Sequence, residues 1–194
     1  MDRLWTPWRY NYVSRAQSPG RKGVPAALSA WPGDDRGCVF CNMLAAVAWA
    51  KETGMPPAEA EQAAYILIMR EHCFICLNAF PYSTGHLLIL PYQHTASLAA
   101  VEPPAAGQMM SLARASELWL RTLYNPDGLN LGINMGEAAG AGVAGHLHLH
   151  ALPRWSGDAS FITTVGETRI LPEALDDTWR RLRELITSEQ PGNR

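Results

Sequence analysis

Hydrophobic and polar residues alternate most strictly in one short stretch late in the chain, where histidine and leucine take turns. Strict alternation is typical of a β-strand, in which side chains two positions apart share a face. His146, His148 and His150 should therefore point to one side of the strand, and Leu147 and Leu149 to the other. The leucine face can pack on a core. The imidazole face cannot do so cheaply unless each ring finds hydrogen-bond partners, so it is the first candidate for chemistry.

Other stretches also have the length and composition of strands. They are short, rich in branched and aromatic residues, and bounded by turn residues. The first two are close enough in sequence to form a hairpin, and a proline ends the third. The predicted strands cover residues 65–69, 73–77, 86–90, 129–134, 145–152 and 161–165.

Helical spacing of apolar residues is clearest over Pro104–Tyr124. A last helix is expected to begin at Pro172, with acidic residues early and arginines late, as the helix dipole favours. Shorter helical segments are expected at residues 42–49 and 58–63. Strands joined by short links, with few helices, predict an α+β fold. The expected architecture is an antiparallel sheet of about five strands packed with two main helices, not a doubly wound parallel sheet.

The composition supports one globular domain. The chain has 194 residues, of which 47% are hydrophobic and 18% charged, a balance typical of a folded protein. We expect a single domain over residues 1–194, with an aromatic and basic arm at residues 1–13 and a loop-rich insertion at residues 14–36.

The net charge and the hydropathy of the chain limit the classes of partner that we expect it to bind. The formal net charge of −2 gives no basic field for nucleic acid or for an anionic membrane. No apolar run approaches the roughly 18 residues that a membrane span needs, and the N-terminus lacks the apolar stretch of a signal peptide. The expectation is a cytoplasmic protein with no nucleic-acid or membrane partner.

The four cysteines form two Cys-x-x-Cys pairs in different settings. Cys38 and Cys41 lie just ahead of a predicted helix, where such a pair favours metal or redox chemistry in a reducing compartment. Cys73 and Cys76 lie within a predicted strand and on its opposite faces, which favours a packing role and argues against a four-cysteine metal site.

A glycine-rich segment leads directly into the histidine strand. Residues 134–145 contain four glycines and few bulky side chains, so a ligand can approach the backbone N–H groups closely. Such groups bind phosphate oxygens well.

Two mechanisms compete for the three histidines. They could bind a catalytic metal, which needs three protein ligands and an open position. Alternatively, one neutral imidazole could attack phosphorus, with its other nitrogen held by a carbonyl group and neighbouring donors stabilising the phosphoryl charge. The adjacent phosphate-binding segment favours the second mechanism.

The run from His146 to Arg154 resembles the signature of the histidine-triad family, in which single hydrophobic residues separate three histidines. Further segments are similar to the bacterial branch of that family related to diadenosine tetraphosphate phosphorylases and dinucleoside polyphosphate hydrolases. The most similar segments are residues 4–9, 77–82, 85–91 and 153–158. The resemblance as a whole covers roughly residues 3–13 and 37–180.

The resemblance implies separate roles for the histidines. His148 matches the family nucleophile, which forms a nucleotidyl-histidine intermediate. His150 matches the residue that contacts the α-phosphate or the bridging oxygen. His86 matches a histidine behind the active site that holds a triad partner by a hydrogen bond.

Substrate contacts are implied in the same way. Asn78 matches a position that touches ribose, and Asn134 belongs to the phosphate-loop region together with Gly140 and Gly142. The polar side chain that is usual in this loop is replaced here by the sequence Ala-Gly-Val at residues 141–143. Backbone groups would therefore have to bind the phosphate.

The resemblance also implies a structural zinc ion. In metal-binding relatives the Cys-x-x-Cys pair is completed by two histidines, so the ligands here would be Cys38, Cys41, His94 and His146. Such a closed Cys₂His₂ site would brace the N-terminal arm against the catalytic strand and would not activate water.

Taken as a whole, the resemblance implies a histidine-triad fold, a homodimer, and an adenine nucleotide as substrate. The implied activity is nucleotidyl transfer or hydrolysis on nucleoside polyphosphates, with orthophosphate or water as acceptor. The N-terminal segment and residues 155–158 favour phosphorolysis. The alternatives are a phosphoramidase or nucleoside-monophosphate hydrolase of the same superfamily, and a nucleotide-binding regulator with incidental catalysis.

Overall fold

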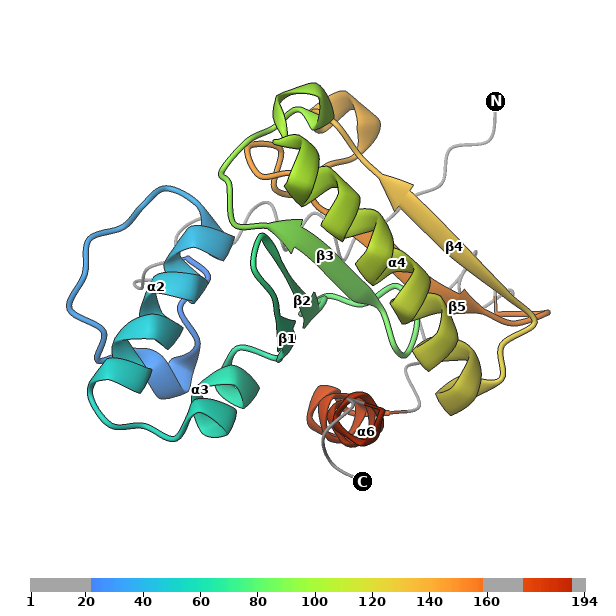
Figure 1. Cartoon of the computed structure of the whole chain (residues 1–194), viewed down its shortest axis with the longest axis horizontal. Helices are drawn as coiled ribbons and strands as arrows, with labels where there is room; N and C mark the ends of the chain where they lie inside the picture. Colours follow the sequence, from blue (N-terminus) through green and yellow to red (C-terminus); the bar gives the residue numbers. More distant parts are fainter. Residues whose placement is uncertain (1–21, 159–172, 190–194) are drawn as a thin grey trace, which may run out of the picture.

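A five-stranded antiparallel sheet forms the centre of the computed structural model, which describes residues 22–158 and 173–189 (Figure 1). The strand order is β1-β2-β3-β5-β4, and every neighbouring pair is antiparallel. This arrangement confirms the predicted α+β class. The strands are Ile66–Met69 (β1), Cys73–Leu77 (β2), Leu87–Pro91 (β3), Gly128–Ile133 (β4) and Leu149–Arg154 (β5).

Helices pack on both faces of the sheet. The helices α4 and α6 share one hydrophobic core with the sheet, and α2 and α3 share a second core on its other face. The α-helices of the described residues are Val39–Glu52 (α2), Pro57–Ala63 (α3), Pro103–Tyr124 (α4) and Leu175–Ser188 (α6). Short 3₁₀ helices occur at Ala26–Leu28 (η1), Leu98–Ala100 (η2) and Glu137–Ala139 (η3).

The two cores explain why β2 and β3 have continuous apolar sequences. All five residues of each strand are buried. Ile75 and Ile89 face the core with α4, whereas Phe74 and Leu88 face the core with α2. A strand covered on both faces needs no polar side, so its sequence reads as a hydrophobic run.

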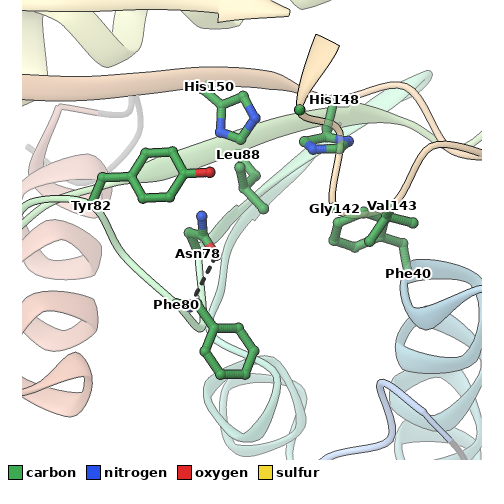
Figure 2. A pocket seen from close by; sticks show the side chains of 10 residues that line it. Phe40, Asn78, Phe80, Tyr82, Leu88, Gly142, Val143, His148 and His150 are labelled. Carbon is green, nitrogen blue, oxygen red and sulfur yellow. Dashed lines mark hydrogen bonds between the residues drawn. The ribbon is translucent and has the colours of Figure 1, made fainter. Parts of the chain in front are cut away.

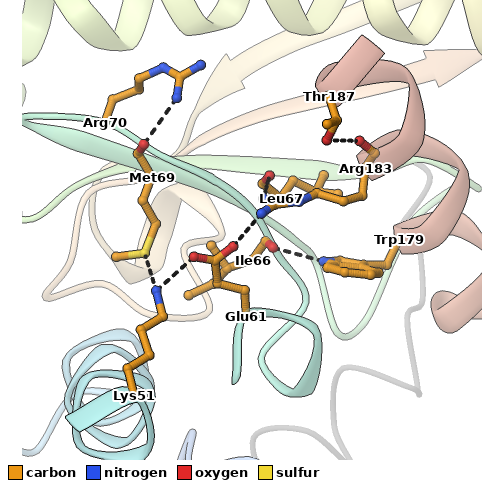
Figure 3. A network of polar contacts seen from close by, with 9 residues as sticks. All are labelled: Lys51, Glu61, Ile66, Leu67, Met69, Arg70, Trp179, Arg183 and Thr187. Atoms are coloured by element: carbon orange, nitrogen blue, oxygen red, sulfur yellow. Dashed lines mark hydrogen bonds and ion pairs between the residues drawn. The ribbon is translucent and has the colours of Figure 1, made fainter. Parts of the chain in front are cut away.

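The C-terminal helix covers the edge of the sheet at β1 (Figure 3). Trp179 donates through its indole N–H to one carbonyl of β1, at 2.8 Å, and Arg183 donates to the next. Arg183 also pairs with the buried carboxylate of Glu61 at 2.7 Å, which accepts a second bond of 2.7 Å from Lys51. Glu61 therefore joins α2, α3 and α6, and α6 satisfies two carbonyls of this edge strand.

Some boundaries differ from the sequence predictions. The strand predicted over residues 145–152 is paired only over Leu149–Arg154, since its pairing with β3 and with β4 stops at Leu149 in both cases. Just before β5, the N–H of Leu147 donates instead to the carbonyl of Thr95, at 2.6 Å. The leucines nevertheless face the α4 core as the alternation predicts.

Two helices also begin elsewhere than expected. α2 runs over Val39–Glu52, longer than the predicted residues 42–49, because the helix starts directly after Cys38, whose backbone is extended. α6 begins at Leu175 and not at Pro172, because the backbone of Ala174 is extended.

Part of the expected outline lies outside the described residues, namely the arm at 1–13 and the strand at 161–165. Of the predicted insertion, the described part is not an isolated loop, since Leu28 and Trp31 are buried in the core with α2. Within the described ranges, no helix combines the length and the apolar character that a membrane span requires.

Candidate active site

A pocket opens between His148 and His150, the first turn of α2 and the glycine-rich loop (Figure 2). It is a partly open hollow that communicates with solvent. Aromatic and aliphatic side chains form much of its wall, and two histidines face it. The lining residues are Phe40, Asn78, Phe80, Tyr82, Leu88, Gly140, Gly142, Val143, His148 and His150.

His148 has the hydrogen bonding of a nucleophile. Its Nδ1–H donates to the carbonyl oxygen of His146 at 2.8 Å, and this bond leaves the lone pair on Nε2. The residue is 4% exposed, and burial lowers the pKa of His148 below its ordinary value of 6.5. The imidazole is therefore neutral at neutral pH, as a nucleophile must be.

His150 is held from behind by His86. The Nε2 of His86 lies 2.9 Å from the Nδ1 of His150, and both rings are buried. Gly85 makes the turn that brings His86 to the sheet, with φ of +77°. A Cβ at Gly85 would lie 2.8 Å from the ring of Tyr124, so this close approach requires glycine.

The glycine-rich loop uses part of its own backbone for folding. Gly140 adopts a left-handed conformation with φ of +91°, and its N–H donates to the carbonyl of Glu137 at 2.8 Å. In the described part of the chain, the N–H groups of Gly142 and Val143 have no carbonyl acceptor. These two amides are therefore the better candidates for binding a phosphate.

A candidate metal centre lies behind the pocket wall. The Sγ of Cys38 is 3.4 Å from the Nδ1 of His146, and the Sγ of Cys41 is 3.4 Å from the Nδ1 of His94 and 3.7 Å from that of His146. Tetrahedral zinc with bonds of 2.0–2.3 Å separates its ligand atoms by about 3.3–3.8 Å. All four ligand atoms lie within 4.8 Å of one another, so the donor set fits zinc.

The hydrogen bond of His146 also suits it to bind a metal ion. The Nε2–H of His146 donates to the carbonyl of Pro91 at 3.0 Å, which leaves Nδ1 free of hydrogen on the side of the cysteines. Burial, together with the neighbouring Cys38, raises the pKa of the Cys41 thiol to about 11. A bound metal would offset this cost of forming the thiolate.

The three histidines do not converge on one ion. Among the described residues, His146 is the only one of the three in a group that could share a metal. His148 and His150 bond instead to a carbonyl and to His86. This geometry argues against a catalytic metal held by all three.

Of the two asparagines predicted to contact substrate, only one lies at the pocket. Asn78 lines the pocket, whereas Asn134 follows β4 and is not among the lining residues. Cys73 and Cys76 are buried in the two different cores, as expected for packing residues on opposite faces of β2.

Sequence reasoning missed the hydrophobic wall of the pocket. Phe40 lies between the two metal-site cysteines, with its ring centroid 5.5 Å from those of both His146 and His148. No periodicity marks such residues, because they come from separate segments. The wall residues without a predicted role are Phe40, Phe80, Tyr82, Leu88 and Val143.

Comparison with other sequences gives a consistent set of relatives. Residues 59–157 match the family model of the HIT domain. An AP-4-A phosphorylase of Mycobacterium tuberculosis is 29% identical over 194 residues, which span 98% of this chain and 87% of that protein. An uncharacterized HIT-like protein of the same species is 30% identical over 154 residues, which span 78% of this chain and 94% of that protein.

Solved structures agree with the sequence matches. A Zn-bound histidine triad family protein from Mycobacterium smegmatis is 30% identical with a TM-score of 0.55, and the match covers 78% of this chain and 97% of that one. A hypothetical histidine triad nucleotide-binding protein from Sulfolobus tokodaii is 27% identical with a TM-score of 0.53, and the match covers 64% of this chain and 84% of that one.

Proposed function

This chain belongs to the HIT domain family, and on that basis we propose that it transfers a nucleotidyl group from a nucleoside polyphosphate through a covalent intermediate on His148. The observation that carries the proposal is the hydrogen bond from the Nδ1–H of His148 to the carbonyl of His146. This bond directs a neutral lone pair on Nε2 toward a pocket with a phosphate-binding loop.

The proposed reaction has two steps. The Nε2 of His148 attacks the α-phosphorus of the substrate, a P–N bond forms, and the bond to the leaving polyphosphate oxygen breaks. The backbone amides of Gly142 and Val143 would stabilise the charge on the phosphoryl oxygens. An acceptor oxygen then attacks the same phosphorus and releases His148. With diadenosine tetraphosphate, ATP leaves in the first step.

Orthophosphate is the proposed acceptor. It would convert the intermediate to ADP, whereas water would convert it to AMP. The similarity to an AP-4-A phosphorylase along 98% of the chain supports phosphorolysis. The test is to incubate the protein with diadenosine tetraphosphate, with and without orthophosphate. ADP and ATP formed only with phosphate support the proposal, and AMP and ATP formed without it indicate a hydrolase.

A structural zinc ion at Cys38, Cys41, His94 and His146 is part of the proposal. The donor geometry and the similarity to a Zn-bound histidine triad protein support it. A zinc ion with four protein ligands has no open position, so its contribution would be to hold the start of α2 against the segment before β5. The chemical steps belong to His148 and the groups around it.

The same pocket would also suit two alternative functions. A phosphoramidase or nucleoside-monophosphate hydrolase would use His148 on a different substrate, and a nucleotide-binding regulator would not need His148. The variant His148→Ala separates catalysis from binding. Turnover should fall by at least about 10³-fold while AMP binding is retained. Substantial residual turnover would contradict the covalent mechanism.

We also propose a homodimer in the cytoplasm. The outer edge of β4 has no strand beside it in the described chain, and Leu131 on this strand is 49% exposed. An open sheet edge with an exposed leucine is suited to pairing with a second copy.

A further inference from the structure

The Nδ1 of His86 receives a backbone donor that defines its tautomer. The N–H of Tyr82 donates to this nitrogen at 3.1 Å. A backbone amide can only donate, so Nδ1 accepts and the hydrogen of the neutral ring lies on Nε2. His86 is 1% exposed, so its ring nitrogens depend on hydrogen bonds within the chain.

This tautomer sets that of His150. Only one hydrogen can lie between the Nε2 of His86 and the Nδ1 of His150, which are 2.9 Å apart. Since Nε2 of His86 carries it, Nδ1 of His150 accepts, and the Nε2 of His150 holds the hydrogen of that ring. His148 and His150 therefore have opposite tautomers, a lone pair on one Nε2 and a hydrogen on the other, with ring centroids 4.8 Å apart.

The side chain of Asn78 adds to this arrangement. The N–H of Phe80 donates to the Oδ1 of Asn78 at 3.0 Å, which fixes the orientation of the amide. The Nδ2 then points to the Nδ1 of His86 at 3.3 Å, as a second donor beside Tyr82. The ring of Tyr82 packs on both His86 and His150 and restrains their rotation.

We infer that Asn78 is a positioning residue, which acts through His86 to keep the hydrogen of His150 on Nε2, where it can donate to a phosphoryl or leaving-group oxygen. The kinetic part of this inference rests on the proposed function. A contact with ribose alone would give Asn78 an effect on substrate binding but none on the tautomers of the histidines.

The tautomers can be measured directly. In ¹⁵N-labelled protein at pH 7.5, long-range ¹H–¹⁵N spectra distinguish a protonated ring nitrogen from an unprotonated one, with resonances assigned from single histidine variants. The wild type should show unprotonated Nδ1 and protonated Nε2 in both His86 and His150. A protonated Nδ1 on His86 in the wild type would overturn the inference, whatever the variants do.

The test variant is Asn78→Asp, which keeps the acceptor for Phe80 and replaces the donor that faces His86 with an oxygen. The Nδ1 of His86 should then become protonated, because a charge-assisted bond to the new carboxylate is stronger than the remaining bond from the N–H of Tyr82. The matched control is Ser83→Ala, at a residue in the same loop as Asn78. This variant removes the bond from Ser83 to the carbonyl of Pro153 in β5 and leaves the contacts of the histidines described above in place. Unchanged spectra in Asn78→Asp would overturn the role of Asn78.

The kinetic readout separates positioning from binding. In Asn78→Asp, kcat should fall about tenfold or more, with KM changed less than about threefold, while Ser83→Ala stays close to wild type. A loss confined to KM would mean a substrate contact and would overturn the inference. The spectra require no substrate, so lack of turnover in the wild type would contradict the proposed function without deciding the tautomers.

Discussion

At the scale of single residues, neighbouring histidines differ in chemistry because their hydrogen-bond partners differ. His146 donates through Nε2 to Pro91 and presents Nδ1 to the cysteines, whereas His148 donates through Nδ1 and presents Nε2 to the pocket. The two rings are only two positions apart in sequence. One residue is thereby suited to bind a metal and the other to attack phosphorus.

Phe40 is expected to contribute to nucleotide affinity, because it lines the pocket and packs on His148. Loss of one aromatic contact to a base costs about 1–3 kcal/mol. The variant Phe40→Ala should therefore bind AMP at least about fivefold more weakly by calorimetry, with its zinc content unchanged.

Val39→Ala is the matched control, because Val39 lies between the same two cysteines but does not line the pocket. This variant should bind AMP as the wild type does. Equal losses in both variants would show that the effect passes through the metal site and not through the pocket wall.

At the scale of elements, α2 joins the candidate metal site to the pocket. Its first turn carries Phe40 and Cys41, and Cys38 directly precedes it. The wall of the pocket thus begins at the proposed zinc ligands. Loss of the metal should consequently affect both the stability of the domain and the binding of nucleotide.

The variant Cys38→Ser is predicted to lose zinc, with a melting temperature several degrees lower and weaker AMP binding. Metal content by mass spectrometry and melting with and without chelator provide the measurements. Cys73→Ala is the control, because Cys73 is buried in the α4 core away from the proposed ligands. Wild-type zinc content in Cys38→Ser would contradict the assigned ligand set.

The attachment of α6 near its start is expected to depend on pH. The carboxylate of Glu173 accepts bonds from Tyr124 at 2.7 Å, Thr178 at 2.8 Å and Arg181. Burial acts to raise the pKa of Glu173, but these bonds hold it below its ordinary value of 4.5. The charged carboxylate therefore stabilises the fold above about pH 4.5, and this contribution is lost as the pH falls through the lowered pKa.

Glu173→Gln should accordingly destabilise the protein by about 1 kcal/mol at pH 7, and the difference from wild type should shrink on acidification below pH 4.5. Denaturant unfolding at several pH values measures this. Glu184→Gln is the control, because Glu184 makes only a 3.9 Å contact with Arg180 on the surface of the same helix. A difference that is constant with pH would contradict the assigned role of the charge.

Local patterns predict the elements of this fold better than their contacts. The strand at residues 73–77 is observed where the sequence places it, because both of its faces are buried and turns bound it. The strand predicted at 145–152 is paired only from Leu149, because Leu147 bonds to Thr95 and not to β3, which alternation alone does not indicate. Likewise, the bond between Glu61 and Arg183 joins residues 122 positions apart, and no local pattern indicates it.

The candidate site shows the same division. The histidine triad and the cysteine pair were visible from spacing and from the family resemblance. The aromatic wall and the bond between Asn78 and His86 arise only when β2, β3 and α2 are brought together.

At the scale of the whole molecule, the two edges of the sheet differ. α6 covers the edge at β1, whereas β4 forms the other edge, with Leu131 exposed. Leu131 is paired with Ala151, which faces the α4 core, so Leu131 lies on that same face of the sheet. This edge is where we expect the second copy of a homodimer to bind.

Leu131→Glu should convert the proposed dimer to a monomer in sedimentation velocity, because a buried charge without a partner is costly at an interface. Leu98→Glu, at an exposed leucine of η2, should leave the mass unchanged. A monomeric wild type, or a dimeric Leu131→Glu, would contradict the assigned interface.

The covalent intermediate on His148 is the central claim, and it can be trapped. The protein is mixed with diadenosine tetraphosphate without orthophosphate, quenched within milliseconds in alkaline denaturant, and digested for mass spectrometry. The account predicts an adenylyl group on His148 in the wild type and none in His148→Ala. Turnover without an adduct, or an adduct on another residue, would contradict it.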